Sequence, residues 1–139
     1  MRNVTPPLTL VAEPDATLSS GSLRLYAMLR SPLDPPGYAP SPVGCIDLYA
    51  YDPLNRRCAV GIMVATAHRR HGMALAMLQA LEKLYGGQLH QLYADIAATN
   101  AASIALFAKA GYRQCGLFRD WLADDDRYID SVRMQKTIL

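Results

Sequence analysis

Apolar residues recur at every second position in several short runs, a spacing typical of β-strands. In Ser22–Leu29, Leu23 and Leu25 alternate with more polar neighbours, and a weaker candidate strand, LTLVAE, lies near residue 10. The β-rich runs VGCIDLYAY and RRCAVGIMV are joined by DPLN, whose proline and polar side chains favour a tight turn. These two runs are therefore predicted to pair as an antiparallel hairpin.

Two longer runs have the three- to four-residue spacing of an amphipathic helix. The first begins at Met73 and ends at the glycine pair 86–87, which is typical of a helix C-cap. The second spans Thr99–Gly111, with Thr99 or Asn100 as its N-cap. The apolar stripe of the first helix is predicted to consist of Leu75, Leu78, Leu81, Leu84 and Tyr85.

The remaining runs complete the expected fold. A short buried strand is predicted at Leu92–Ala97, and two more, at about 112–121 and 127–136, flank the acidic turn ADDD. Hairpins combined with one strand–helix–strand crossover indicate an α/β fold on a mixed sheet. Eight of the nine prolines precede residue 43, so Ser31–Pro42 is predicted to be a long loop. With 139 residues, we expect residues 1–139 to form a single domain.

Composition and charge narrow the functional classes. The 14 lysines and arginines are scattered and nearly balance 12 acidic residues, so no nucleic-acid partner is expected. No run of eighteen apolar residues occurs and no apolar stretch follows the N-terminal arginine, so we expect no membrane contact, no signal peptide and a cytoplasmic location. Cys45, Cys58 and Cys115 are odd in number and far apart, which argues against a disulfide framework and a zinc site.

The junction before the first predicted helix carries the most distinctive chemistry. Arg69, Arg70 and His71 directly precede Gly72, and the helix begins at the next residue. A helix N-terminus has unpaired N–H groups and a partial positive charge, so this junction suits an anion such as a pyrophosphate. From these residues alone two interpretations remain open: a phosphate site, or a solvated loop with a turn glycine. The Walker pattern of nucleotide-binding loops is absent.

A second motif follows, and the two together resemble a known family. The spacing Arg69-x-x-Gly72-x-Ala74 and the later segment NAASIALFAKAGY are similar to the paired signatures of the GNAT superfamily of acetyl-CoA-dependent N-acetyltransferases. The runs VGCIDLYAYDPLNRRCAVGIMV and GLFRDWLADDDRYIDSVRMQK resemble the branch that contains ribosomal-protein N-terminal and spermidine acetyltransferases. The resemblance covers residues 42–137 and leaves 1–41 as a divergent, proline-rich part. It implies a mostly antiparallel sheet with two main helices and a splayed strand pair that forms the acetyl-CoA cleft.

The resemblance also implies which residues hold acetyl-CoA. The pyrophosphate would lie on the loop and helix start, while strand backbone and the second helix would bond the pantetheine arm. The implied cofactor-binding residues are Ile62, Met63, Val64, Arg69, Arg70, His71, Gly72, Met73, Ala74, Asn100, Ser103 and Phe107, with no metal. The implied acceptor is a primary amine on a protein N-terminus, a polyamine or another small molecule.

The implied reaction is attack of a neutral amine on the thioester, which is assisted by a group that removes the amine proton. Asp47, in the run CIDLY, is the first candidate for this catalytic base, and Asp52 and His68 are weaker ones. The alternative for Asp47 is a polar side chain on the exposed face of an antiparallel strand.

Two features depart from the family pattern. Phe107 stands where members usually carry a tyrosine that protonates the CoA thiolate, and phenylalanine cannot donate a proton. Residues 1–41 lack the two helices that normally build much of the acceptor pocket. Three interpretations follow: an open pocket for a large acceptor, a homodimer whose second subunit completes the pocket, or a non-catalytic CoA-binding module. A phosphate or nucleotide binder unrelated to CoA is a further alternative.

Overall fold

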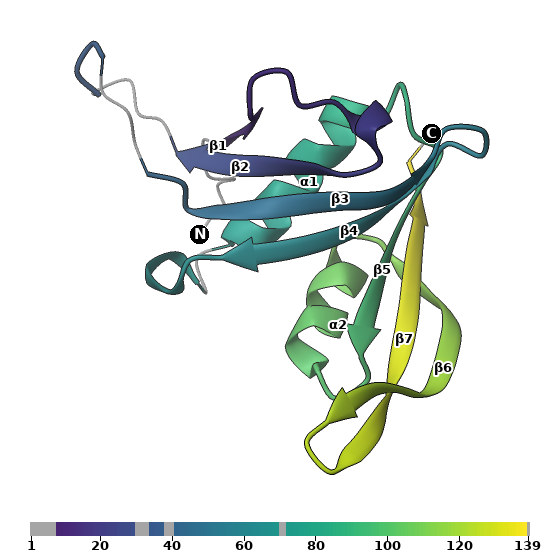
Figure 1. Ribbon diagram of the computed structural model, residues 1–139. Coiled ribbons are helices and arrows are strands. Elements are labelled where there is room, and N and C mark those ends of the chain that lie inside the picture. Colours follow the sequence, from purple (N-terminus) through teal and green to yellow (C-terminus); the bar gives the residue numbers. More distant parts are fainter. Residues whose placement is uncertain (1–7, 30–33, 38–40, 70–71, 139) are drawn as a thin grey trace.

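The computed structural model describes residues 8–29, 34–37, 41–69 and 72–138, arranged as Figure 1 shows. These residues form a seven-stranded sheet in the order β1-β2-β3-β4-β5-β7-β6. The strands are β1 Leu8–Ala12, β2 Leu23–Leu29, β3 Gly44–Asp52, β4 Arg57–Val64, β5 Gln91–Ala97, β6 Arg113–Asp124 and β7 Arg127–Thr137. The helices are α1 Met73–Tyr85 and α2 Ala101–Lys109, with 3-10 turns η1 Leu18–Ser20 and η2 Thr66–His68.

Neighbouring strands are antiparallel except for β4 and β5, which are parallel and connected through α1. The predicted α/β fold on a mixed sheet and the predicted β3–β4 hairpin are both confirmed. In the hairpin turn, the Asp52 carboxylate accepts hydrogen bonds from the side-chain and backbone nitrogens of Asn55 at 2.8 and 2.9 Å, which lower the pKa of Asp52. The predicted loop Ser31–Pro42 lies partly outside the described residues.

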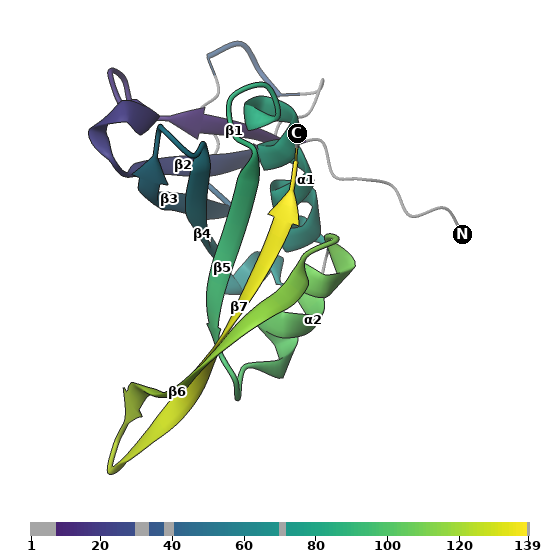
Figure 2. The same cartoon turned by 90° about the vertical axis from the view of Figure 1, so that its right-hand side faces the viewer.

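Side chains alternate between a covered face and an open face of the sheet. In β2, Leu23, Leu25 and Ala27 are buried, whereas the residues between them are more exposed. The buried side chains of the strands form one cluster with those of α1 and α2. Figure 2 shows both helices on one side of the sheet. The opposite face, which carries the intervening side chains, is not covered by either helix.

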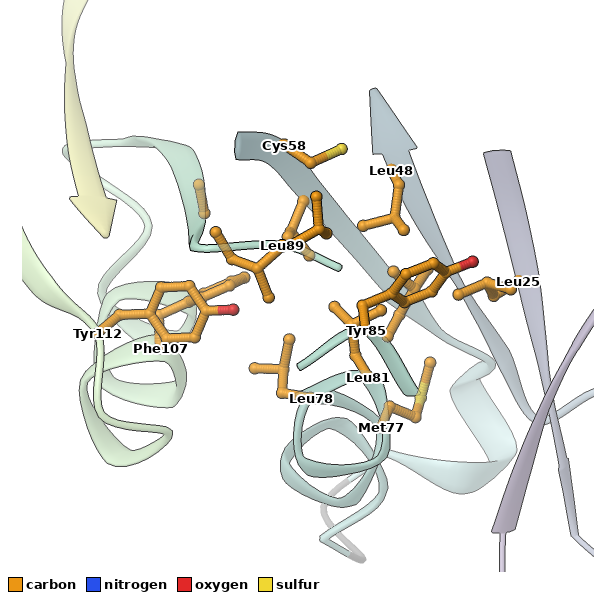
Figure 3. Packing of buried hydrophobic residues seen from close by; sticks show 14 of the residues in the cluster. Leu25, Leu48, Cys58, Met77, Leu78, Leu81, Tyr85, Leu89, Phe107 and Tyr112 are labelled. Carbon is orange, nitrogen blue, oxygen red and sulfur yellow. The ribbon is translucent and has the colours of Figure 1, made fainter. Parts of the chain in front are cut away.

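The buried stripe of α1 differs from the predicted one. Met77, Leu78, Leu81 and Tyr85 point into the core (Figure 3), whereas Leu84 is 50% exposed. An α-helix has 3.6 residues per turn, so residues spaced by three drift around its axis. The predicted series 78, 81, 84 therefore leaves the buried face, and the four-residue steps 77, 81, 85 stay on it.

Lys136 of β7 forms bonds to the C-terminal ends of both helices. Its Nζ forms an ion pair with Glu82 of α1 and donates a hydrogen bond to the Ala110 carbonyl oxygen after α2, at 2.7 Å. Nearby, the ring of Phe107 meets that of Tyr112 edge-on, with centroids 4.9 Å apart (Figure 3). The two contacts of Lys136 connect β7 to the ends of both helices.

Within the described residues, no helix has the length and apolar character that crossing a bilayer requires. Cys45, Cys58 and Cys115 are free thiols, and burial raises the pKa of Cys58 to about 11. The same part of the chain contains no cluster of three or more histidine, cysteine or acidic side chains placed to hold a metal ion.

Candidate functional site

The parallel strands β4 and β5 separate after a short paired segment. Their register begins with Arg57 opposite Gln91 and ends with Ala59 opposite Tyr93. Beyond that point β4 continues to Val64 with β3 as its partner, and β5 continues with β7 as its partner. Figure 1 shows the two strands running apart from their paired ends. The expected splayed strand pair is therefore present.

The separation leaves one edge of β4 without a neighbouring strand. The backbone N–H of Ala65 donates to the carbonyl oxygen of the residue before β3 at 2.8 Å, so the backbone of residue 65 faces β3. Backbone groups of successive strand residues point in opposite directions, so those of Ile62 and Val64 face the free edge and those of Met63 face β3. Consistent with this, a Cβ atom on Gly44 of β3 would overlap the Met63 carbonyl oxygen.

The three consecutive residues Ile62, Met63 and Val64 differ in the direction of their backbone groups. Of the three consecutive residues expected to present their backbone to a ligand, Ile62 and Val64 have N–H and C=O groups on the free edge. Met63 directs its backbone groups into the β3–β4 ladder, and its side chain is 64% exposed. The alternation of strand backbone, which the sequence resemblance does not take into account, is the reason for the difference.

The N-terminus of α1 lies just beyond the end of β4. Gly72 is its N-cap, with φ of +75°, a conformation that favours glycine, and nothing lies within 4 Å of where a Cβ would be. Gly72 has no capping side chain, so the first helical residues, Met73 and Ala74, keep N–H groups suited to an anion. The Arg69 Nε donates to the Val64 carbonyl oxygen at 3.1 Å, which holds the guanidinium against the free edge. Arg70 and His71 lie outside the described residues.

Asn100 and Ser103 lie at the start of α2, after the end of β5. The Asn100 Oδ1 accepts a hydrogen bond from the Ser103 backbone N–H at 3.1 Å, so Asn100 is the N-cap, one of the two predicted positions. The cap occupies Oδ1 and leaves the Asn100 Nδ2 as a donor. The first sequence motif therefore follows the end of β4, and the second follows the end of β5. These are the two strands that separate.

Asp47 lies on the open face of β3, next to the separated part of β4. It is the register partner of Gly61 in β4 and of Arg24 in β2. Its carboxylate accepts two hydrogen bonds from Arg24, at 2.6 and 2.9 Å, and this bidentate pair raises the pKa of Arg24. The weaker candidates lie elsewhere, since Asp52 is bonded in the hairpin turn and His68 belongs to η2.

A second carboxylate, which the sequence analysis did not identify, lies on β5 across the separation. Asp95 follows the last β4–β5 pair and is the register partner of Arg133 in β7. Arg133 donates to both its oxygens at 2.7 and 2.9 Å, and the guanidinium stands over the rings of Tyr93 and Phe118, 4.4 and 5.3 Å from their centroids. Burial, and then the charge of Asp95, raise the pKa of Tyr49 on β3, which places Tyr49 within electrostatic reach.

Two arginine-held carboxylates therefore flank the separated segment on the open face. The alternation of LYADIA, in which Asp95 falls between buried Ala94 and Ile96, is a signal that could have identified it. Its partner lies 38 residues further along the chain, and no local pattern indicates that pairing.

Phe107 lies in the core, with 3% of its surface exposed. The neighbouring Tyr112 is equally buried, and its hydroxyl has no hydrogen-bond partner within the described part of the chain. Burial, with a smaller effect of Glu82, raises the pKa of Tyr112. Neither ring therefore presents an accessible acidic proton at the open face.

Comparisons with known proteins agree with this arrangement. The model of the acetyltransferase (GNAT) domain family matches residues 18–113, and no curated protein matches the sequence. The spermidine N-acetyltransferase of Vibrio cholerae, solved with CoA and spermine, has a TM-score of 0.74 at 18% identity, over 86% of this chain and 67% of that one. The ribosomal L7/L12 alpha-N-protein acetyltransferase RimL has a TM-score of 0.74 at 16% identity, over 86% of this chain and 72% of that one.

A third solved structure has the same fold. The microcin C7 self-immunity acetyltransferase MccE, in complex with acetyl-CoA and AMP, has a TM-score of 0.72 at 15% identity. The match covers 86% of this chain and 62% of that one. At these identities the structural likeness establishes the fold, and the family match establishes the relationship.

Proposed function

Because the chain belongs to the acetyltransferase (GNAT) domain family, we propose that it transfers the acetyl group of acetyl-CoA to a primary amine. The observation that carries the proposal is the separation of β4 and β5 directly ahead of the α1 N-terminus. A free strand edge next to a helix N-terminus suits a ligand that has both an extended, amide-bearing arm and a pyrophosphate. Solved neighbours that share the fold were determined with CoA or acetyl-CoA bound.

The residues at the junction fit the parts of acetyl-CoA. On the free edge, the N–H and C=O groups of Ile62 and Val64 would bond the pantetheine amides as a further strand would. The first N–H groups of α1 and the Arg69 guanidinium would bond the pyrophosphate, and the open space at Gly72 allows it to approach the backbone. The Asn100 side chain, whose Nδ2 remains a donor, would contact the arm from the β5 side.

The chemistry requires one bond exchange and one net proton transfer. The amine nitrogen attacks the thioester carbonyl carbon, so that a C–N bond forms and the C–S bond breaks, and the departing sulfur takes up a proton while the nitrogen loses one. Asp47 and Asp95 are the candidates for accepting the amine proton, directly or through a water molecule. A thiol is a good leaving group, with a pKa of about 8.5, so the absence of a tyrosine at Phe107 slows the reaction without abolishing it.

A second candidate function is CoA binding without turnover. It is favoured by Phe107, which is buried and offers no proton where family members usually carry an acid. The two functions require the same CoA site and differ only in acetyl transfer, so one experiment separates them.

That experiment combines thermal unfolding with and without acetyl-CoA and thiol release against a panel of amines and peptides. Acetyl-CoA at a hundredfold excess over its Kd is expected to stabilise the fold by about 2.7 kcal/mol, with thiol release for at least one acceptor. Stabilisation without thiol release for any acceptor would favour the second function. If acetyl-CoA does not stabilise the protein, the assigned junction is wrong.

The phosphate role has its own test. The double variant Arg69→Glu and Arg70→Glu should weaken CoA binding far more than binding of a pantetheine fragment that lacks the pyrophosphate. The double variant Arg119→Glu and Arg127→Glu changes the net charge equally at the β6–β7 hairpin and serves as the control. Equal losses for CoA and the fragment would refute the phosphate role.

A further inference from the structure

A surface hollow of about 470 Å³ lies beside the candidate base Asp47. The β1–β2 connection contributes Glu13 and Ser22 to its lining, β2 contributes Arg24, and β3 contributes Asp47 and Tyr49. We call it the β2–β3 hollow. Asp47 is the register partner of Gly61 in the separated part of β4, so the hollow adjoins the segment where the thioester would lie.

The charges that line the β2–β3 hollow leave one negative charge unpaired. Arg24 is bound by both oxygens of Asp47, so these two charges compensate each other. The Glu13 carboxylate makes no hydrogen bond or ion pair with any other described residue. The hollow therefore suits a ligand with one positive charge. A second positive charge on the ligand would be repelled by Arg24 and would find no further unpaired carboxylate in the described lining to bind.

The neighbouring carboxylates do not change this balance. On the open face, Asp95 is paired with Arg133, and at the end of the hairpin Asp52 is paired with Arg57 at 3.3 Å. A polyamine carries two or more positive charges and binds best where several unpaired carboxylates converge. Around Asp47, each of these acidic side chains except Glu13 already has an arginine partner.

The β2–β3 hollow is larger, and has more apolar lining, than a small monoamine would fill. Its volume falls in the range of about 300–1,000 Å³ that is typical of ligand sites. Ala16, Leu23 and Leu48 complete the lining with apolar surface, and Tyr49 is 40% exposed beside them. A ligand of matching shape has one ammonium group followed by neutral amides and side chains.

We propose that the β2–β3 hollow receives the amino-terminal residues of a peptide chain, with the α-amine at Asp47 and the following residues along Tyr49 and the β1–β2 connection. This inference rests on the proposed acetyl transfer and names its acceptor class. The α-amine is the single positive charge of such an acceptor, and Glu13 supplies the matching negative charge while the amine is still protonated. Nε and Nη2 of Arg24 are bonded to Asp47, and its Nη1 would donate to a peptide carbonyl oxygen.

The first test compares acceptors on the wild-type protein. A pentapeptide amide with uncharged side chains and a free N-terminus is expected to be acetylated with a higher kcat/KM than spermidine or butylamine. The same pentapeptide with an acetylated N-terminus is the matched control and should be inert. A higher kcat/KM for spermidine would overturn the peptide assignment and leave the acetyl-transfer proposal standing.

The second test changes the charge of the hollow. Arg24→Gln releases Asp47 from its partner and adds one unpaired negative charge, so the ratio of kcat/KM for spermidine to that for the peptide should rise roughly fivefold. Arg127→Gln removes an arginine that is paired with Asp124 on the β6–β7 hairpin and should leave the ratio unchanged. An equal ratio in both variants would contradict the charge argument.

Binding of the peptide is measured separately from turnover, by titrating the pentapeptide into protein saturated with CoA and following NMR shifts. Shifts confined to the lining of the β2–β3 hollow are expected, and Glu13→Gln should weaken them. Shifts elsewhere, or none at millimolar peptide, would overturn the inference even if acetyl transfer is observed. If the hollow binds the peptide but no thiol is released, the acetyl-transfer proposal fails and the peptide-binding assignment stands.

Discussion

Replacing Tyr112 with phenylalanine should stabilise the protein. Tyr112 is 3% exposed, and its hydroxyl is buried without a hydrogen-bond partner in the described part of the chain. A buried polar group that lost its water and gained no partner costs about 1–3 kcal/mol. Tyr112→Phe removes that group and keeps the ring, so its edge-on contact with Phe107 at 4.9 Å is retained.

The size of the effect follows from the length of the chain. For a domain of 139 residues, a change of 1 kcal/mol in the free energy of unfolding moves Tm by about 3 °C. Tyr112→Phe is therefore expected to raise Tm by about 3–10 °C. The proposed CoA site should be unaffected, because the hydroxyl points into the core (Figure 3).

The pH dependence provides a second signature of the same group. Burial raises the pKa of Tyr112 in the folded state above that of an unfolded tyrosine, which is about 10. Below pH 10 both states keep the proton and no contribution depends on pH. Above pH 10 the unfolded state loses its proton first, so stability falls as pH rises. Tyr112→Phe should reduce this alkaline loss.

The assay is thermal unfolding followed by circular dichroism, at pH 7 and at intervals up to pH 11. Tyr85→Phe is the matched control, because Tyr85 is 9% exposed and its hydroxyl is not among the buried unpaired atoms. Its effect at pH 7 should be clearly smaller. If Tyr112→Phe leaves Tm unchanged or lowers it, the hydroxyl has a partner and the reasoning is wrong.

Three further predictions concern the sheet and the site. Gly44→Ala should lower the free energy of unfolding, measured by urea denaturation, by about 1–3 kcal/mol, because the added Cβ would overlap a β4 carbonyl oxygen. Gly61→Ala is the control: its Cβ would meet only ordinary contacts, the nearest at 3.8 Å, so the free energy of unfolding should change little. Phe107→Tyr should raise turnover or leave it unchanged in the thiol-release assay, with thermal unfolding as the control because the added hydroxyl enters the core. A large drop in turnover with an unchanged Tm would mean that the phenylalanine ring acts as a wall of the proposed acetyl site. Asp47→Asn should reduce turnover and change its pH profile if Asp47 is the base; an unchanged profile, with a change in Asp95→Asn instead, would assign that role to Asp95.

The elements of this fold are predictable because each has a local cause. The turn at Asp52 and the N-cap at Asn100 depend on side chains that bond backbone nitrogens three residues away, and such short-range bonds leave a readable pattern. The buried leucines of β2 are predictable because successive side chains of a strand point to opposite faces of the sheet. Leu84 lies off the buried face because a step of three residues from Leu81 drifts around a helix with 3.6 residues per turn.

The ion pairs of the site were not predictable because their partners are distant in sequence. Arg24 and Asp47 are 23 residues apart and meet only through the register of β2 and β3. Arg133 reaches Asp95 because β7 lies between β5 and β6, an order that local patterns do not determine. Both carboxylates were visible as acidic residues in strands, but their partners required the three-dimensional structure.

The proposed CoA site and the proposed acceptor hollow are built from different parts of the chain. The proposed CoA contacts belong to β4, α1, β5 and α2, a continuous strand–helix–strand–helix unit that the sequence pattern predicts in full. The proposed acceptor hollow is lined in part by the connection between β1 and β2, where the described segment 13–22 contains the 3-10 turn η1 and no α-helix. Because the two sides come from separate parts of the chain, substitutions in segment 13–22 should change the KM for the acceptor and leave the Kd for CoA unchanged. Coupled changes in both constants would show that the short connection also supports the CoA site.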